Sequence, residues 1–459
     1  MIFSAQTDIL ETSFKDYNMA YRLKKIFLLA GDFAILNLAL FLTLVIRYPR
    51  SLRAESWQNH WPSFLVIFVI WLLILYINDL YNLNLKIGSR QFFRLTINAV
   101  LAASLLSIFY FYLNVQSAIT PKTNLAIFIA LFVALFLIWR GLFRLTVLSF
   151  IPENNLAIIG FNDPACKLLA ELKRNPGAGY QTALIFKSSE EIAALPASIK
   201  EKNIHTVVVC DDFGQSEKLR EALFGCLPYN LTFFDYPDLY ELLTGKVPME
   251  AISQSWFLEK LKEGEKNYFN FCKRIVDFLA ALLILIISLP AWPIIALGIK
   301  LSGRGPVLFR QTRVGRNEKN FEIIKFRTMR TENNNLAPTE EEDGRITSFG
   351  SFLRKTRLDE IPQAINILKG EMSFIGPRPE RPEIVSELER QIPFYKTRLL
   401  IKPGLTGWDQ VSGHYHSPST DDSLEKLQHD LYYLKQRSFY LDFAITLKTL
   451  ATMMSRSGR

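Results

Sequence analysis

Long runs of apolar residues are the feature that most constrains the fold of this chain, and they lie in its first third and around residue 280. A helix needs about 20 apolar residues to cross the hydrocarbon core of a bilayer. Four runs, at 26–46, 64–80, 95–113 and 125–139, approach that length, and the shorter ones extend through aromatic and amphipathic flanks. We therefore predict a membrane protein in which residues 1–150 form a four-helix transmembrane bundle.

Basic residues next to these runs predict the orientation of the spans, because loops rich in Lys and Arg stay in the cytoplasm. They precede span one, separate spans two and three, and follow span four: Arg22, Lys24, Lys25, Lys86, Arg90, Arg94, Arg140 and Arg144. Arg47, Arg50 and Arg53, in the first outside loop, oppose this orientation. The majority places both termini inside.

Asp32 is a carboxylate well inside the first run, where an acid can belong to a proton or ion path. It lies about two helical turns from the basic edge at Arg22, Lys24 and Lys25. We interpret it as a residue within reach of interface water and basic partners, with the proton path as the alternative.

Net charge and cysteine content exclude few classes of binding partner. The formal net charge of +9 suits a protein that faces anionic lipid and phosphorylated substrates. Charge alone would fit nucleic-acid binding equally well. The four cysteines lie far apart without a C-x-x-C pair, which indicates neither a zinc site nor a disulfide framework.

Residues 151–265 read as a Rossmann-like α/β middle domain. Short apolar segments at 156–161, 182–186 and 205–210 alternate with helical patterns, which is typical of a parallel sheet. The first turn, from Gly160 to Ala165, has only the first glycine of G-x-G-x-x-G. A pyrophosphate could not approach that backbone closely, so we predict a structural or regulatory domain without a bound dinucleotide.

A fifth apolar run, Ile275 to Leu297, is long enough to span the membrane but contains Pro290 and Pro293 near its middle. Proline removes a backbone donor and clashes one turn back, so the helix must kink there. A kinked span and a helix that dips into the inner leaflet and returns fit the pattern equally. A full crossing would place everything after it away from nucleotide-activated substrates.

Beyond Lys300 the chain is rich in Arg, Gly and Pro in compact blocks. Alternation in 321–326 places Lys325 on one face of a short strand, with Arg327 following on the same face. Two cations on one face suit a pyrophosphate, and they equally suit solvent. Arg378 lies between Pro377 and Pro379, which fix the backbone and leave a pre-ordered guanidinium for phosphate oxygens; the prolines could also simply shape a turn.

Asp359 and Glu360 come just before Pro362 and a helical pattern that ends at Gly370, so we expect both acids in the first turn of a helix. Acids there can cap backbone N–H groups without any catalytic role. The helix dipole would also lower the carboxylate pKa and keep Asp359 ionised, as a nucleophile or magnesium ligand requires. Position alone does not separate the two readings.

Taken in order, these blocks resemble the bacterial polyprenyl-phosphate hexose-1-phosphate transferases that initiate exopolysaccharide, capsule and O-antigen synthesis. The resemblance runs from Lys273 to the C-terminus and rests on KRIVDF, the broken apolar run, FRQTRVG, KFRTM, RLDEIPQ, GEMSFIGPRPERPE and KPGLTGWDQVSG. The four spans and the α/β segment resemble the long members of this family by layout.

This resemblance implies a mixed α/β catalytic domain at 266–459 with a ping-pong mechanism. Asp359 would attack the sugar-linked phosphate and release UMP, and undecaprenyl phosphate would then take the sugar phosphate. Glu360 would hold Mg²⁺, or Mn²⁺ in its place, beside the Asp359 carboxylate. The residues implied to hold phosphate oxygens are Lys325, Arg327, Arg354 and Arg378.

The resemblance also implies a re-entrant helix over about 273–299 that breaks at Pro290 and keeps the catalytic domain on the cytoplasmic face of the bacterial inner membrane. The implied partners are a UDP-sugar, undecaprenyl phosphate and the bilayer, with no nucleic acid. A homodimer through the spans or the middle domain is one option for the oligomeric state. The commonest donors of long members are UDP-glucose and UDP-galactose, but no residue here names the sugar.

Two departures and two alternatives stay open. The family commonly has Ala and Asn at the positions of Asp409 and Ser412, so contacts with the substrate could differ. One alternative is a membrane-anchored nucleotide-sugar oxidoreductase or dehydratase, which the degenerate Gly160 turn and the lack of a nearby Tyr-x-x-x-Lys pattern oppose. The other is a non-catalytic scaffold for polysaccharide assembly.

Overall fold

The computed structural model describes residues 2–83, 85, 87–113, 121–150, 154–175, 178–187, 191–210, 217–229, 231–261, 263–330, 344–412 and 419–454. Lys86, one of the basic residues used above for orientation, lies outside these ranges. The chain forms two compact units, Met1–Thr244 and Gly245–Arg459, which are described separately below. The segment 245–265 therefore belongs to the second unit, whereas the sequence grouped it with the middle domain.

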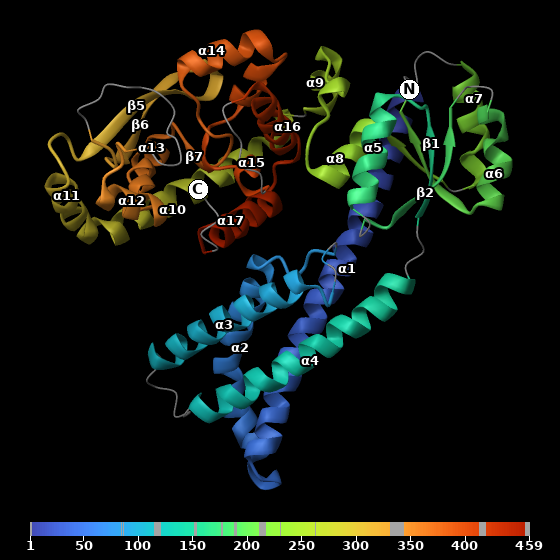
Figure 1. Ribbon diagram of the computed structural model, residues 1–459. Helices are drawn as coiled ribbons and strands as arrows, with labels where there is room; N and C mark the ends of the chain where they lie inside the picture. The colour runs from blue at the N-terminus through green and yellow to red at the C-terminus, as the bar shows by residue number, and fades with distance from the viewer. Residues whose placement is uncertain are drawn as a thin grey trace. The chain divides into compact units, whose positions relative to one another are not determined.

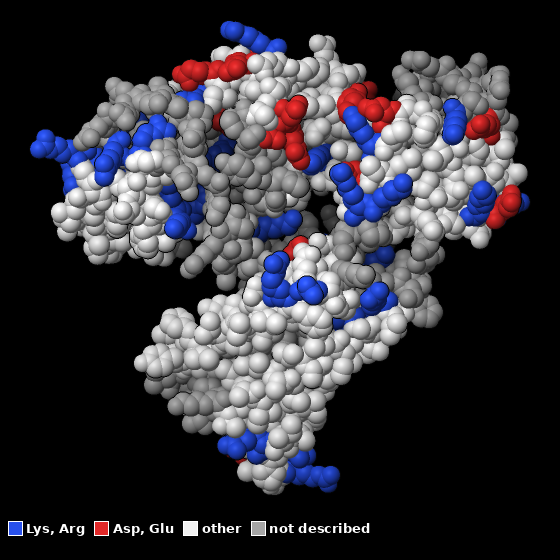
Figure 2. All heavy atoms as spheres, in the orientation of Figure 1, with Lys and Arg blue, Asp and Glu red and all other residues white. Residues whose placement is uncertain are grey.

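Four long helices open the first unit: α1 (Ile2–Arg47), α2 (Arg53–Ile77), α3 (Arg90–Leu113) and α4 (Pro121–Phe150) (Figure 1). Each contains a stretch long and apolar enough to cross a membrane, at 24–47, 50–77, 90–113 and 123–146. Figure 2 shows Lys and Arg at the two ends of these helices and an uncharged surface between them, on the face in view and among the described residues. The apolar runs thus form long membrane-type helices, as predicted.

Aromatic side chains fill the space between these helices. The Trp71 ring lies 4.6 Å from that of Phe132 and 5.6 Å from that of Phe128, centroid to centroid, and all three are fully buried. Phe64 and Phe68 from α2 complete this cluster. Lipid tails are as apolar as these rings, so close packing more than water exclusion holds such helices together.

Asp32 on α1 has a partner that the sequence did not single out for it. Its Oδ2 lies 2.8 Å from Nη2 of Arg140 on α4, and both side chains are almost completely buried. Gly31, next to it, leaves room for Trp139, because a Cβ at Gly31 would lie 2.1 Å from that indole ring. The ion pair and the close approach both join α1 to α4.

The rest of the first unit is an α/β layer structure. Strands β1 (Asn154–Ile159), β2 (Tyr180–Phe186), β3 (Ile204–Val209) and β4 (Thr232–Asp235) form a parallel sheet of order β2-β1-β3-β4. Helices α5 (Asp163–Arg174) and α8 (Tyr236–Thr244) cover one face, and α6 (Leu195–Glu201) and α7 (Glu217–Gly225) cover the other (Figure 1). The parallel α/β region predicted from the alternating pattern is confirmed.

The turn between β1 and α5 is stabilised by the chain's own side chains. Gly160 adopts a left-handed φ of 93°, which glycine reaches without strain. The Asn162 side chain then accepts a hydrogen bond from Ala165 N at 3.1 Å and donates one to Cys210 O at 2.8 Å. A donor at the start of α5 is therefore already used by the chain's own side chain, at the position where a dinucleotide fold would place a phosphate.

The second unit carries two small sheets among helices. Strands β5 (Leu308–Val314) and β6 (Asn320–Phe326) pair antiparallel, and β7 (Ser373–Ile375) and β8 (Gly404–Thr406) pair parallel. The helices are α9 (Gln254–Lys260), α10 (Asn267–Ser288), α11 (Trp292–Leu301), α12 (Ser348–Lys355), α13 (Gln363–Lys369), α14 (Pro382–Gln391), α15 (Trp408–Val411), α16 (Thr420–Gln436) and α17 (Phe439–Met454).

Helices α10 and α11 are the two arms of one apolar segment of 35 residues, 267–301. A single 3-10 turn, Leu289–Ala291, separates them and contains Pro290 (Figure 1). The Trp292 Nε1 donates to Ser288 Oγ at 3.2 Å across this turn. Most of the large apolar side chains of the segment are exposed in the isolated chain, as expected for a surface that faces lipid. The break therefore lies where the sequence placed it.

Candidate active site

Asp359 and Glu360 occupy a 3-10 turn, Leu358–Glu360, that precedes α13. They therefore lie just outside the helix and not in its first turn, because Pro362 serves as the N-cap of α13. Arg357 enters the turn in the left-handed region, with φ of 58°. Asp359 is 8% exposed. Non-glycine residues in this region of φ/ψ space cluster at functional sites.

Cations from separate segments surround this acid pair. Lys325 on β6 places its Nζ 3.0 Å from Glu360 Oε1, and the Arg357 guanidinium lies 3.9 Å from the same oxygen. The charge of Arg354, on α12, acts on Asp359, and that of Arg378, in the loop after β7, acts on Glu360. The fold thus brings Lys325, Arg354 and Arg378 together around the acids.

Arg357 is a residue of this cluster that the sequence reading did not select. The block RKTRLDEIPQ contains it three residues before Glu360, a spacing at which side chains in helical turns meet. That spacing is the signal that could have identified it.

The two carboxyl groups differ in their affinity for a proton. Burial, and next the charge of Glu360, raise the pKa of Asp359 to about 6, against the cations Lys325, Arg354 and Arg357. Burial alone would also raise the pKa of Glu360, but Lys325, Arg378 and Arg357 outweigh it and lower that pKa below its usual value. The expectation that a helix dipole lowers the pKa of Asp359 is wrong, because burial and the adjacent acid dominate.

These opposite shifts predict opposite effects of charge removal on stability. The pKa of Asp359 is higher in the folded than in the unfolded protein. Protonation of Asp359 therefore contributes to the free energy of unfolding in full below the unfolded pKa of 3.8, and this contribution is lost as the pH rises through about 6. In EDTA at neutral pH, Asp359→Asn should therefore increase the free energy of unfolding by about 1–3 kcal/mol. The gain should fade as the pH falls from 6 toward 4, which thermal melting of the purified protein would measure.

Glu360→Gln is the matched control at the neighbouring position. Its folded pKa is lowered, so the contribution of this carboxylate is present above the unfolded value and is lost as the pH falls through the folded value. The substitution should lower the melting temperature at neutral pH and have little effect in acid. Shifts of the same sign for both variants would contradict this assignment of charges.

Arg327 lies elsewhere. Its guanidinium donates to Arg304 O at 2.7 Å, Ile299 O at 3.0 Å and Gly303 O at 2.6 Å, and its side chain is buried. These carbonyls belong to the end of α11 and the residues after it, where a helix leaves acceptors without partners. We therefore assign Arg327 to capping α11 and not to phosphate binding, although Lys325 precedes it by only two positions.

A divalent cation fits the acid pair. Asp359 Oδ1 is buried and accepts no hydrogen bond from the part of the chain that the structure describes. Such an oxygen beside a second carboxylate is the kind of ligand that Mg²⁺ takes, and Mg²⁺ completes its shell with water and substrate phosphates. No group of three His, Cys, Asp or Glu side chains that could hold a metal ion exists among the described residues. Protein groups alone would thus leave most coordination positions free.

The two departures, Asp409 and Ser412, interact with residues of the C-terminal segment. Asp409 is buried at the start of α15, where its charge contributes to a raised pKa of Asp430. Ser412 donates its hydroxyl to Trp408 O at 2.6 Å. Both residues therefore interact with the chain's own C-terminal core.

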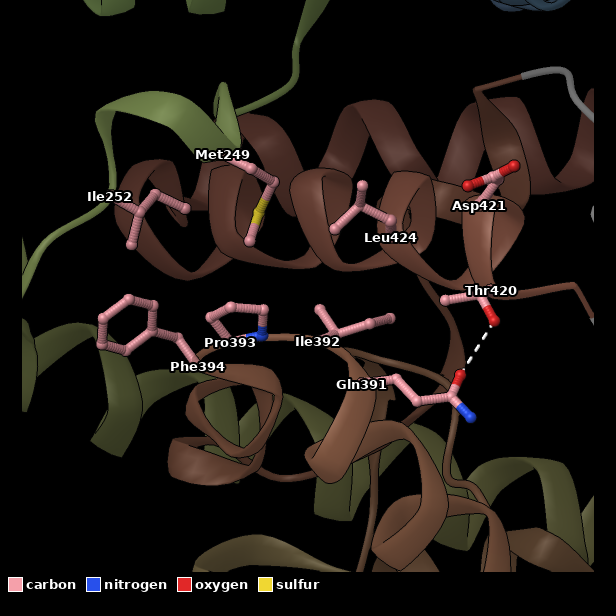
Figure 3. Close-up of a pocket in the computed structure, with 9 residues that line it drawn as sticks. All are labelled: Met249, Ile252, Gln391, Ile392, Pro393, Phe394, Thr420, Asp421 and Leu424. Atoms are coloured by element: carbon pink, nitrogen blue, oxygen red, sulfur yellow. Dashed lines mark hydrogen bonds between the residues drawn. The ribbon is translucent and has the colours of Figure 1, made fainter.

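The second unit also contains a hollow that none of these charged residues lines. It has a volume of about 440 Å³ and lies between 249–252, the end of α14 and the start of α16 (Figure 3). Its lining is mostly apolar, with Asp421 at one end and a hydrogen bond of 2.8 Å from Thr420 Oγ1 to Gln391 Oε1. The lining contains no Lys or Arg. A phosphorylated substrate would find no cation there, so this hollow is not the phosphate site.

An acid pair surrounded by cations, in the same unit as a broken apolar helix, is an arrangement that suits phosphoryl chemistry at a membrane. Comparison with known proteins agrees. Residues 268–456 match the family described as bacterial sugar transferase. The chain is 30% identical over 327 residues to a UDP-glucose:undecaprenyl-phosphate glucose-1-phosphate transferase of Xanthomonas campestris pv. campestris, covering 67% of this chain and 68% of that relative.

Two further relatives match shorter stretches. A UDP-N-acetylgalactosamine-undecaprenyl-phosphate N-acetylgalactosaminephosphotransferase of Aeromonas hydrophila is 37% identical over 235 residues, 51% of this chain and 55% of that protein. A UDP-glucose:undecaprenyl-phosphate glucose-1-phosphate transferase of Escherichia coli K12 is 41% identical over 181 residues, 39% of each chain. The chain thus matches about half to two thirds of the length of the first two relatives and less of the third. It belongs to the bacterial family of polyprenyl-phosphate sugar-1-phosphate transferases.

Proposed function

We propose that this protein transfers a hexose-1-phosphate from a UDP-sugar to undecaprenyl phosphate, giving a polyprenyl-diphospho-sugar and UMP. This would be the first membrane step of exopolysaccharide, capsule or O-antigen synthesis. The observation that carries the proposal is the buried Asp359, which lies beside the ionised Glu360 among Lys325, Arg354, Arg357 and Arg378. The names of the relatives support the donor and the acceptor.

The arrangement supports a two-step exchange at phosphorus. In the first step an oxygen of Asp359 attacks the phosphate bonded to the sugar, a P–O bond to Asp359 forms, and the bridging P–O bond breaks to release UMP. In the second step an oxygen of undecaprenyl phosphate attacks the same phosphorus, and the Asp359 carboxylate leaves. A pKa near 6 leaves the carboxyl mostly ionised at neutral pH, as a nucleophile requires.

The cations have separate tasks in this scheme. Lys325 and Arg357 hold Glu360 in place through the contacts of 3.0 and 3.9 Å. Arg354, whose Nε donates to Thr328 Oγ1 at 2.9 Å, and Arg378 would bind phosphate oxygens, where a guanidinium offers two parallel donors. Bound beside Asp359 and Glu360, Mg²⁺ or Mn²⁺ would neutralise charge on the phosphate oxygens.

The apolar segment 267–301 is proposed to enter the membrane from the cytoplasmic side and return there. A straight helix of 35 residues would be about 50 Å long, which exceeds the roughly 30 Å of hydrocarbon. Both arms instead pack on neighbouring residues of β6. Ala281 of α10 shares a core with Ile323, and the Trp292 ring of α11 lies 5.1 Å from that of Phe326.

Polar contacts tie the outer ends of both arms to the same folded unit. Arg274 donates from its Nη1 and Nη2 to Ile367 O at 2.5 Å and to Leu368 O at 2.7 Å. Arg327 donates to the carbonyls at the end of α11. This arrangement supports a re-entrant helix that breaks at Pro290, with a cytoplasmic active site in the inner membrane. Lipid phosphate and soluble nucleotide sugar could both reach such a site.

The identity of the sugar is a proposal of its own. UDP-glucose and UDP-galactose are the donors we propose first, and the N-acetylgalactosamine named in the Aeromonas relative makes an N-acetyl sugar the necessary comparison. Membranes containing the protein should release UMP when given undecaprenyl phosphate, Mg²⁺ and the correct member of a panel of UDP-sugars. Mn²⁺ should replace Mg²⁺, and EDTA should stop the release.

Omitting undecaprenyl phosphate is the informative control. A ping-pong enzyme should then release about one UMP per active site and stop. Release of UDP in place of UMP would overturn the proposal, because it would mean that the sugar moves without its phosphate. Reduction of NAD by the purified protein would revive the oxidoreductase alternative.

A further inference from the structure

Every backbone carbonyl oxygen of the turn Pro377–Glu380, which contains Arg378, accepts a hydrogen bond. Pro377 O accepts from Gly404 N at 2.9 Å, and Glu380 O accepts from Val314 N at 3.0 Å. Between them, Arg378 O accepts from Arg398 Nη2 at 3.0 Å, and Pro379 O accepts from Arg313 Nη1 at 3.1 Å. Four successive carbonyls thus have donors from three other segments. The backbone beneath Arg378 is fixed more completely than its flanking prolines alone require.

Arg398 is unusual among these donors because it is a charge inside the protein. It is 4% exposed and lies in the 3-10 helix Tyr395–Leu400. Its Nη1 donates to the Tyr395 hydroxyl at 2.7 Å, and its Nη2 lies 2.8 Å from Asp430 Oδ2 on α16. Asp430 is itself 2% exposed. A planar guanidinium is a side chain that can lie against a phenol, a carboxylate and a carbonyl together.

Such a buried ion pair needs a reason beyond stability, since an apolar pair of similar volume is often as stable or more so. The reason offered by this geometry is the third contact, to Arg378 O. The charge of Arg378 in turn acts on Glu360 and lowers the pKa of that carboxyl group. A chain of contacts therefore runs from Asp430 through Arg398 to the Arg378 backbone, and the Arg378 charge acts on Glu360.

We infer that Arg398, held by Asp430 and Tyr395, is a positioning residue that sets the Arg378 guanidinium for the substrate phosphate. It touches neither substrate nor metal and acts only through the Arg378 backbone. The inference rests on the proposed function, because it assumes that Arg378 binds a phosphate oxygen. Binding that depends on a pre-set guanidinium is sensitive to small displacements, and a misplacement of about 1 Å can cost on the order of 10²-fold in rate.

A double-mutant cycle tests the inference. Arg398→Lys keeps a positive charge for Asp430, but an ammonium lacks the planar fork that meets all three partners. With UDP-glucose, or the panel sugar that gives the fastest UMP release, Arg398→Lys should raise KM about tenfold and lower kcat less. Arg378→Ala should lower kcat/KM on the order of 10²-fold. The double variant should be no worse than Arg378→Ala, because Arg398 has nothing left to position.

Lys246→Met is the matched control, since it removes a different ion pair of the same unit, that of Lys246 with Glu425. Its effect should multiply with that of Arg378→Ala and leave KM unchanged. Where Arg398→Lys lowers the melting temperature too far for kinetics, Tyr395→Phe takes its place in the cycle. It removes only the hydroxyl that orients Arg398 Nη1.

The outcomes separate the two claims. If Arg378→Ala leaves kcat/KM unchanged, the proposed phosphate role of Arg378 fails. If Arg378→Ala is impaired but the effects of the two substitutions multiply, Arg398 acts through general stability and the positioning inference is overturned. If Arg398→Lys lowers kcat/KM in the wild-type background but not in the Arg378→Ala background, the positioning inference is supported.

Discussion

Replacement of Asp359 by Asn should reduce UMP release by at least roughly 10³-fold, with the protein still folded and in the membrane. An amide has the size of the carboxyl group but is not a nucleophile at phosphorus, so the first step has no attacking oxygen. The measurement is UMP release from the preferred UDP-sugar in membranes, in the presence of undecaprenyl phosphate and Mg²⁺. Protein amount must be matched between the variant and the wild type, and the variant must melt at a temperature no lower than that of the wild type.

The same variant also decides between an enzyme and a scaffold. A non-catalytic assembly protein would retain its function with Asn at position 359, whereas the proposed transferase would lose it. Without undecaprenyl phosphate, the wild-type peptide that contains Asp359 should gain the mass of a hexose phosphate. Residual activity above about one hundredth of wild type, or the label on another residue, would contradict the role of Asp359.

Removing Asp32 alone should destabilise the packed helices α1–α4 by about 3–5 kcal/mol, because it leaves Arg140 buried without its counter-charge. Asp32→Leu is the direct form of this experiment. The double variant Asp32→Leu/Arg140→Leu should recover most of the loss, since apolar residues can replace a buried pair of charges. Thermal melting in detergent or nanodiscs, followed by tryptophan fluorescence, would measure both.

Thr43→Val is the control for the surroundings of Asp32. Thr43 is fully buried on the same helix, and its hydroxyl donates within α1 to Ala39 O at 2.7 Å. Its replacement should change stability by less than about 1 kcal/mol. If Asp32→Leu costs no more than Thr43→Val, the ion pair is not what holds α1 to α4. Losses of equal size in the single and double variants would show that packing, and not charge, is decisive.

Local features of the chain were accessible without a structure. The apolar runs of α1 to α4 and the proline break in 267–301 depend on residues that are neighbours in sequence. Alternation of short apolar strands with helical patterns likewise predicted the parallel sheet β2-β1-β3-β4. The block 358–363 marked the acid pair, although it lies in a 3-10 turn before α13 and not within the helix.

The interaction partners of the charged side chains could not be predicted from neighbouring residues in the sequence. Lys325 and Arg327 are two residues apart, and strand alternation assigned them to one face. The structure sends Lys325 to Glu360 and Arg327 to the carbonyls at the end of α11. Asp32 likewise pairs with Arg140, more than a hundred positions away along the chain.

The sequence alone therefore determined that this is a membrane protein with long apolar helices, because the length and hydrophobicity of a helix are local properties. The resemblance of its motifs determined the family. Only the tertiary structure decided which cations surround Asp359, why its pKa is raised to about 6, and which donors fix the backbone of Arg378. Those properties depend on burial and on distances between segments, and the order of residues does not contain either.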